Sequence, residues 1–273
     1  PVGTELYFTA HDSFAYSDDP LALARDQEVD ITSQLNLGVR LLQAQSHEND
    51  GELHFCHTSN SRQLLFDGGT VEDYLKTVKA WLDANPNEVL TFVFTNPEGL
   101  SIKDQWDPAF QNSGVADLAY VPPSTPVKQS DWPTLGELIS SGKRVVVFMD
   151  AGADDGSTVP YILSEFPNVW ETPFSVTDPS FPCSVDRTSG PLPNDEHLYM
   201  INHSLNKNVL DTGIIVSDPA DAPTTNGVSS ILANAYGCTQ FADGRAPNFL
   251  LLDFVDKGEP FKAADILNGF ASA

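Results

Sequence analysis

Basic side chains are scarce in this chain: 14 lysines and arginines stand against 38 aspartates and glutamates, so the formal net charge is -24. Such a charge is repulsive toward nucleic acids and anionic membrane surfaces. Long apolar runs are also missing, because no stretch approaches the roughly 18 to 20 apolar residues that a membrane-spanning helix needs. We therefore expect no nucleic-acid partner and no transmembrane segment.

Cysteine is nearly absent, and the three present are Cys56, Cys183 and Cys238. Three cysteines allow three pairings, and any disulfide leaves one thiol free. Cys183 and Cys238 lie in loop-like surroundings, whereas Cys56 lies within a strand-like run beside a histidine. We predict a disulfide between Cys183 and Cys238 and a buried free thiol at Cys56.

The sequence does contain enough apolar material for a large core, since 41% of its residues are hydrophobic and 16 are phenylalanine. A chain of 273 residues is long for an ordinary domain, but an α/β barrel occupies about 250 residues as one unit. Eight short strand-like runs recur along it: Leu6–Ala10, Val39–Gln45, Leu53–Cys56, Val89–Thr95, Arg144–Met149, Val169–Glu171, Leu198–Asn202 and Asn248–Leu252. We predict one monomeric (β/α)8 TIM-type barrel domain over residues 1–273.

Helical patterns separate several of these runs. The clearest covers Thr70 to Ala84, where Thr70 is placed to cap the first turn and apolar residues recur with helical spacing. Asn85-Pro86 ends this pattern before the next strand-like run. Thr224 to Tyr236 and Pro260 to Phe270 read as later helices, each beside a strand, as a parallel βα repeat requires.

Polar side chains gather at the ends of the predicted strands. In a barrel enzyme the chemistry lies at the carboxyl ends of the strands, because the packed interior leaves only that rim open to substrate. The side chains that fall there are His11, Asp12, Gln43, Gln45, His57, Asn96, Asp150, Glu171, His203 and Asp253. Two histidines and two aspartates among them favour an acid–base site.

Three motifs in the N-terminal half carry a family resemblance. Thr9-Ala10-His11-Asp12-Ser13, then Gly38-Val39-Arg40, then Leu53-His54-Phe55-Cys56-His57 resemble, in order and spacing, the X domain of phosphatidylinositol-specific phospholipases C. The segments TVEDYLKTVKAWLDANPNEV, WPTLGELISSGKRVVVFMD, TDPSFPCSVDR and PNFLLLDF resemble a secreted fungal branch of these phosphodiesterase-like barrels. The resemblance covers nearly the whole chain and implies the same barrel and an extracellular location.

The resemblance also implies roles for individual residues. In these phospholipases one histidine removes the proton of the inositol 2-hydroxyl and a second protonates the leaving oxygen. Carried over, His11 is the general base and His57 the general acid. Asp253 matches the carboxylate that orients the base, and Asp12 the one that assists the acid. An imidazole suits both roles because it titrates near neutral pH. The remaining strand-end residues are predicted to bind substrate: Gln43, Gln45, Asn96, Asp150 and His203.

The chain departs from the family on the second strand. There the family places either an arginine or acidic residues that hold calcium, and either one neutralises the phosphate charge. This chain has Gln43 and Gln45, which bring no charge. Arg40 is no substitute, because its odd spacing from both glutamines turns it to the other face of the strand. Two amides and two carboxylates form a poor site for a hard cation, so we expect no metal and no other cofactor.

Other histidines receive no catalytic role. Alternation along a strand turns His54 away from the face that His57 occupies, so a structural role is expected. His47 and His197 lie in polar segments that we expect to be exposed loops. Asn202-His203-Ser204 forms an N-glycosylation sequon, and a glycan on Asn202 would argue against a buried site at that strand end.

Three functions remain open from the sequence. The first is a secreted phosphodiesterase or lyase that acts on a small-molecule, lipid-headgroup or glycosylphosphatidylinositol-type substrate through His11 and His57. The second is a carbohydrate-active enzyme, a glycan lyase or hydrolase, in which amides bind sugar hydroxyls and Trp106, Trp132 or Trp170 stacks on a sugar ring. The third is a binding protein without activity, since a fold does not determine a function.

Overall fold

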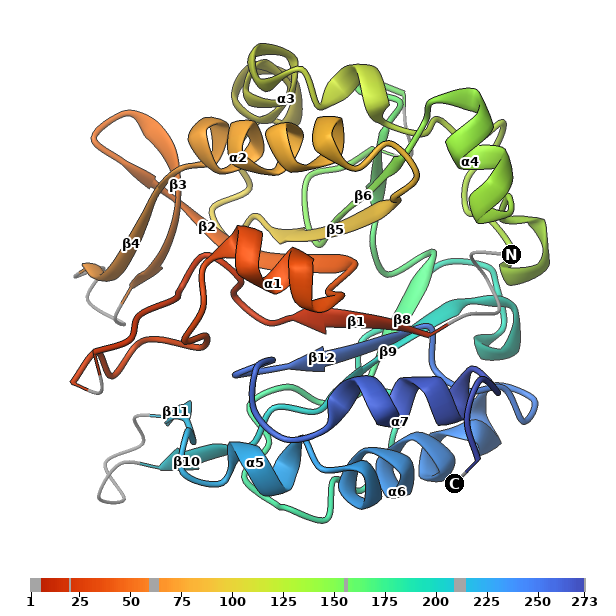
Figure 1. The fold of residues 1–273 in the computed structure, drawn as a ribbon. Helices are drawn as coiled ribbons and strands as arrows, with labels where there is room; N and C mark the ends of the chain where they lie inside the picture. Colours follow the sequence, from red (N-terminus) through yellow and green to blue (C-terminus); the bar gives the residue numbers. More distant parts are fainter. Residues whose placement is uncertain (1–5, 20, 59–63, 155–156, 209–214, 273) are drawn as a thin grey trace.

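A curled parallel sheet forms the centre of the molecule in this computed structural model, which describes residues 6–19, 21–58, 64–154, 157–208 and 215–272 (Figure 1). Its strands follow one another in the order β7-β6-β5-β2-β1-β12-β9-β8, and every neighbouring pair is parallel. Within the described residues no strand pairing joins β7 to β8. Eight parallel strands in this order confirm the predicted barrel-type α/β fold. Their bounds are β1 Tyr7–Ala10, β2 Leu41–Asn49, β5 Leu90–Thr95, β6 Val145–Met149, β7 Ile162–Ser164, β8 Val169–Glu171, β9 Leu198–Asn202 and β12 Phe249–Leu252.

The prediction that Leu53–Cys56 forms a barrel strand is wrong. These residues belong to β3 (Glu52–Thr58), which pairs antiparallel with β2 and with β4 (Leu64–Thr70) beside the barrel. The chain reverses at Asp50 and Gly51, whose φ values of 53° and 86° are those of a tight hairpin turn. The barrel strand that takes its place is β7, a three-residue strand that was not predicted from the sequence.

Helices cover the outside of the sheet. The predicted helix from Thr70 is confirmed as α2, and the Thr70 side chain accepts a hydrogen bond from the Asp73 amide. The helix predicted from Thr224 to Tyr236 is instead two helices, because Gly227 has extended backbone angles and caps the second one. Figure 1 shows α6 and α7 packed side by side under β12 and β9. The bounds are α1 Ile31–Leu37, α2 Val71–Ala84, α3 Asp107–Ser113, α4 Leu135–Ser141, α5 Ala222–Thr225, α6 Val228–Cys238 and α7 Pro260–Leu267.

Three segments gather at the carboxyl end of the sheet. Figure 1 shows there the β3–β4 hairpin, the loop that follows β1, and a second hairpin made of β10 (Asn206–Asn208) and β11 (Ile215–Ser217). Leu41, Phe148 and Leu163 belong to a buried apolar cluster of the barrel. Barrel enzymes receive their substrates at the carboxyl ends of the strands.

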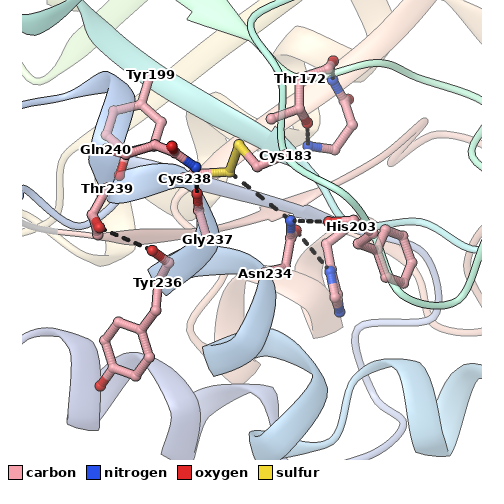
Figure 2. The surroundings of a disulfide bond; sticks show 12 residues. Thr172, Cys183, Tyr199, His203, Asn234, Tyr236, Gly237, Cys238, Thr239 and Gln240 are labelled. Atoms are coloured by element: carbon pink, nitrogen blue, oxygen red, sulfur yellow. Dashed lines mark hydrogen bonds between the residues drawn. A yellow bond between two sulfur atoms is a disulfide. The ribbon is translucent and has the colours of Figure 1, made fainter.

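The predicted disulfide is present. Cys183 and Cys238 are bonded, with a Cα–Cα distance of 5.3 Å, and Cys56 is a buried free thiol. Figure 2 shows that the bond ties the end of α6 to the long segment between β8 and β9. Of the helices in the described part of the chain, none has the length and apolar content needed to cross a membrane.

Candidate active site

A cavity of about 460 Å³ opens at the carboxyl end of the barrel. Val93, Met200 and Leu251 belong to its lining and to the buried apolar cluster of the barrel. Successive side chains on a strand point to opposite faces, so the residues two positions further along also face inward. This alternation aligns polar side chains from several strands in one ring above the floor: Gln43, Gln45, Asp150, Glu165, Glu171 and Asn202.

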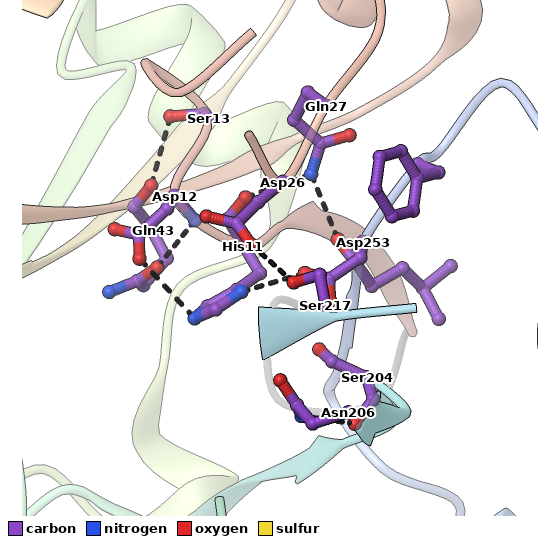
Figure 3. Close-up of polar contacts among 12 residues, drawn as sticks. His11, Asp12, Ser13, Asp26, Gln27, Gln43, Ser204, Asn206, Ser217 and Asp253 are labelled. Carbon is purple, nitrogen blue, oxygen red and sulfur yellow. Dashed lines mark hydrogen bonds and ion pairs between the residues drawn. The ribbon is translucent and has the colours of Figure 1, made fainter. Parts of the chain in front are cut away.

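His11 stands on one side of this cavity between two carboxylates (Figure 3). Its Nδ1 lies 2.7 Å from Oδ1 of Asp253, and its Nε2 lies 3.4 Å from Oδ2 of Asp12. Both aspartates are buried, whereas the imidazole keeps 28% of its side chain exposed. The arrangement fixes the orientation of the ring and leaves it accessible to a ligand.

His57 completes the pair from β3. Its Nε2 lies 3.1 Å from Oδ2 of Asp12 and 3.1 Å from Oδ2 of Asp26, so two carboxylates share one imidazole nitrogen. Asp26 is buried and accepts a hydrogen bond from the hydroxyl of Ser217 on β11. The sequence analysis missed Asp26, since it lies in the loop after β1 and follows no strand.

Asp12 joins the two histidines and is rigidly held. Its backbone amide donates to Oε1 of Gln43 at 2.7 Å, and its Oδ1 accepts from the amide of Gln45 at 2.8 Å. Its φ of 36° lies in the left-handed region, which costs an aspartate free energy and is common at functional sites. The predicted substrate-binding residue Gln43 therefore also positions Asp12.

The carboxylates favour the charged form of both histidines. Burial opposes protonation of His11, but the negative charges of Asp253 and Asp12 outweigh it and raise its pKa to about 10. Burial also opposes protonation of His57, and Asp12 and Asp26 outweigh it and raise its pKa well above the ordinary value. Both imidazoles of the substrate-free site are therefore favoured in their charged form, His11 up to a pKa of about 10.

The opposite wall carries a second polar cluster. Glu171, at the end of β8, forms an ion pair with Arg187 and accepts a hydrogen bond from Nδ2 of Asn202 at 3.1 Å. Glu165 lies beside it and is almost fully buried. Burial and the charge of Glu171 raise the pKa of Glu165 well above its ordinary value, which favours its neutral form. Neither Glu165 nor Arg187 was predicted from the sequence.

Two predicted substrate-binding residues are absent from the residues that line the cavity. Asn96 is buried, and its Nδ2 donates to the carbonyl of Leu100 in its own loop and to that of Ala151 in the segment after β6. His203 is buried between Asn234 and the carbonyl of Thr225. Asn96 directly follows Thr95 and His203 directly follows Asn202, and both Thr95 and Asn202 line the cavity. Because successive side chains on a strand point to opposite faces, Asn96 and His203 point outward. Asp150, Gln43 and Gln45 do line the cavity.

The remaining histidines are held by other groups. His54 lies on the hairpin with Nδ1 2.9 Å from Asp67, which agrees with its expected structural role. His47 is in strand β2, 2.6 Å from Glu98, and His197 is fully buried against the carbonyls of Pro193 and Ser189. The expectation that His47 and His197 lie in exposed loops is therefore wrong.

Two further expectations need correction. Trp106, Trp132 and Trp170 are at most 3% exposed and pack in the core, so they offer no platform for a sugar at the rim. Asn202 is buried, and its Nδ2 donates to Glu171 and to the carbonyl of Thr172. A glycan on that nitrogen would replace one of its two hydrogens and so remove one of these two bonds.

The residues present do not fit the calcium site of the family. One donor atom each from His11, Asp12 and Asp26 lies within 4.8 Å of the others. These carboxylates are already paired with imidazoles, and the second-strand positions hold amides, of which Gln43 uses its oxygen on the Asp12 backbone. Calcium prefers a cage of several carboxylate and carbonyl oxygens.

Apolar side chains surround the mouth of the cavity. Leu23, Leu65, Phe174 and Ile215 belong to its lining and are between 42% and 70% exposed. They come from the β1 loop, the β3–β4 hairpin, the segment after β8 and the β10–β11 hairpin. Exposed apolar residues gathered around one opening mark a surface that meets an apolar ligand or a lipid.

Two proteins that this chain resembles come from Arthroderma benhamiae. A secreted protein of uncharacterised function from Arthroderma benhamiae is 42% identical over 91% of this chain, and a PI-PLC X domain-containing protein 1 from the same organism is 45% identical over 90%. The chain spans 80% of the length of the PI-PLC X relative and 58% of the length of the secreted one.

Solved structures share the fold. Phosphatidylinositol-specific phospholipase C from Staphylococcus aureus superposes with a TM-score of 0.61 at 15% identity, over 97% of this chain and 92% of that one. The Listeria monocytogenes enzyme gives 0.57 at 14% identity, over 97% and 93%. The family model described as PI-PLC X 1 matches residues 6–268. The chain therefore belongs to the PI-PLC X domain family.

Proposed function

We propose that this chain is a secreted phosphodiesterase that cleaves the headgroup of an inositol phospholipid by acid–base catalysis. The observation that carries the proposal is the pair of histidines in one cavity, each held by buried carboxylates. General acid–base catalysis of a phosphodiester needs two proton-transferring groups of this kind within one site. The fold shared with phospholipases named for phosphatidylinositol supports the substrate.

The proposed reaction moves one proton at each histidine. Neutral His11 takes the proton of a substrate hydroxyl through Nε2, while Asp253 holds Nδ1. The hydroxyl oxygen forms a bond to phosphorus, and the bond from phosphorus to the leaving alcohol breaks. His57 gives its proton to the leaving oxygen. The products are a cyclic phosphate and a diacylglycerol, and the charge and the number of protons are conserved.

The apolar mouth supports a lipid over a polysaccharide. Leu23, Leu65, Phe174 and Ile215 would meet the acyl part of a substrate whose headgroup enters the cavity. The three tryptophans that were expected to stack on a sugar ring lie in the core instead. Secretion is supported by the disulfide, which persists in oxidising compartments, and by the relative that is described as secreted.

The test is release of a cyclic phosphate from phosphatidylinositol in vesicles of zwitterionic lipid, followed by ³¹P NMR. We expect His11→Ala and His57→Ala each to lower the rate by about 10²- to 10⁴-fold. His54→Ala is the matched control, because it removes an imidazole that pairs with Asp67 on the hairpin. Absence of a phosphorus-containing product from the wild type, or an unchanged rate in His11→Ala, would refute the proposal.

A further inference from the structure

Strand β2 contributes Gln43 and Gln45 to the cavity lining, and neither side chain carries a charge. Among the described residues that line the cavity, Arg187 is the one lysine or arginine. It comes from the segment after β8, on the wall opposite the histidines. Its side chain keeps 31% of its surface exposed, which leaves the guanidinium open to a ligand.

The guanidinium is fixed in place from several sides. Nη2 pairs with the buried carboxylate of Glu171, and the two residues also form a backbone bridge, in which the Glu171 amide donates to the Arg187 carbonyl. The guanidinium carbon lies 4.7 Å from the ring centre of Phe174 and 5.3 Å from that of Phe166. A planar donor group held in this way loses little conformational entropy when it binds an anion.

The loop that carries Arg187 is itself anchored to the barrel. Cys183, four residues before it, is bonded to Cys238 on α6. Asn234 of the same helix donates through Nδ2 to the carbonyl of Phe181 and, through Oδ1, pairs with His203 (Figure 2). His203, predicted to contact substrate, thus lies in the scaffold behind this loop.

The neighbouring charges leave the guanidinium available. Asn202 donates to the same Glu171 oxygen that Arg187 contacts, so this carboxylate is shared between two donors. Burial and the charge of Glu171 raise the pKa of Glu165 beside this pair, which favours the neutral form of Glu165. A guanidinium has five N–H donors, and one ion pair leaves several of them for phosphate oxygens.

We propose that Arg187 binds the phosphate group of the substrate and replaces the cation that the second strand lacks. This inference rests on the proposed function for the identity of the substrate. The positive charge of Arg187 then lies on the wall opposite the histidines, and the phosphate lies between Arg187 and the His11–His57 pair.

Binding can be tested without turnover. In His11→Ala protein, titration calorimetry would compare myo-inositol 1-phosphate with myo-inositol, which differ by the phosphate. We expect the phosphate to tighten binding by tenfold or more, and Arg187→Gln in the same background to bring the two dissociation constants within about threefold of each other. Arg187→Lys should keep part of the difference.

The matched control is Arg40→Gln, which removes an arginine that pairs with Glu88 and packs on Trp81 outside the cavity. It should keep the full difference between the two ligands. An unchanged difference in Arg187→Gln, or an equal loss of affinity for both ligands, would overturn the inference. An Arg187-dependent difference without any cleavage by the wild type would support this inference and refute the proposed function.

Discussion

Nε2 of His57 lies 3.1 Å from Oδ2 of Asp26, a carboxylate from the loop after β1 that the hydroxyl of Ser217 holds from the β10–β11 hairpin. Three segments distant in the sequence therefore meet at one imidazole. Asp12 contacts the same nitrogen and also reaches His11, so it links the two halves of the acid–base pair.

Replacing Asp26 by asparagine should weaken the proposed acid. Loss of one of the two negative charges lowers the pKa of His57, so less of it stays protonated at alkaline pH. We expect the rate at pH 9 to fall by tenfold or more and the rate at pH 6 to change less, since each unit of pKa is a factor of ten in protonation. Asp67→Asn, which alters the His54 pair on the hairpin, is the control. Equal losses at both pH values would contradict this role.

The rate should rise with pH. His11 must be neutral to act as a base, and its pKa is raised to about 10 by Asp253 and Asp12, which outweigh its burial. We expect kcat/KM to increase between pH 7 and about 10, as His11 loses its proton. A pH–rate profile on vesicles would measure this, and a maximum below pH 6 would be incompatible with His11 as the base.

The free energy of unfolding should fall as the pH rises. The pKa of His11 is raised on folding, so protonation stabilises the fold fully below its ordinary value of 6.5, and this contribution is lost as pH rises through about 10. Urea unfolding should give a free energy that falls across this window. In Asp253→Asn the fall should be smaller, because the partner charge is gone. An equal slope in both proteins would show that the pair contributes little.

Breaking the disulfide should destabilise the protein. Cys183 and Cys238 are 55 residues apart in the sequence, and closing a loop of this length contributes about 4 kcal/mol in the chain-entropy description. Cys183→Ser with Cys238→Ser should lower the free energy of unfolding by several kcal/mol. Cys56→Ser, at the buried free thiol, is the comparison without a lost cross-link. A wild-type-like double variant would refute this contribution.

The apolar side chains at the mouth of the cavity should affect activity on vesicles but not activity on a soluble substrate. Leu23→Ser and Leu65→Ser together remove exposed apolar surface beside the cavity. We expect about tenfold lower activity on phosphatidylinositol vesicles, from a loss of roughly 1–2 kcal/mol of apolar contact. Activity on a soluble short-chain substrate should stay within twofold. Leu37→Ser, on α1 away from the cavity, is the control. Equal losses on both substrates would exclude a lipid-facing role.

Several features follow from the sequence because they depend on local pattern. The helix from Thr70 and the strands Val169–Glu171 and Leu198–Asn202 are readable because apolar spacing and capping residues act over a few positions. His11 and Asp253 directly follow strands that are parallel neighbours, so their proximity follows from barrel order. Strand alternation, applied to every strand end, would also have excluded Asn96 and His203 and pointed to Glu171.

Only the tertiary structure decided the rest. Asp26 and Arg187 come from connecting segments, where no periodic pattern says which side chain points inward. Glu165 directly follows β7, the barrel strand that was not predicted from the sequence. His57 reaches it from a hairpin strand outside the parallel sheet. The sequence by itself predicted the barrel, because strand and helix patterns are short-range, and the resemblance of its motifs to the family predicted the acid–base roles of His11 and His57. The charged side chains around His11 and His57 depend on long-range packing. This packing brings connecting segments together, and local sequence patterns do not predict it.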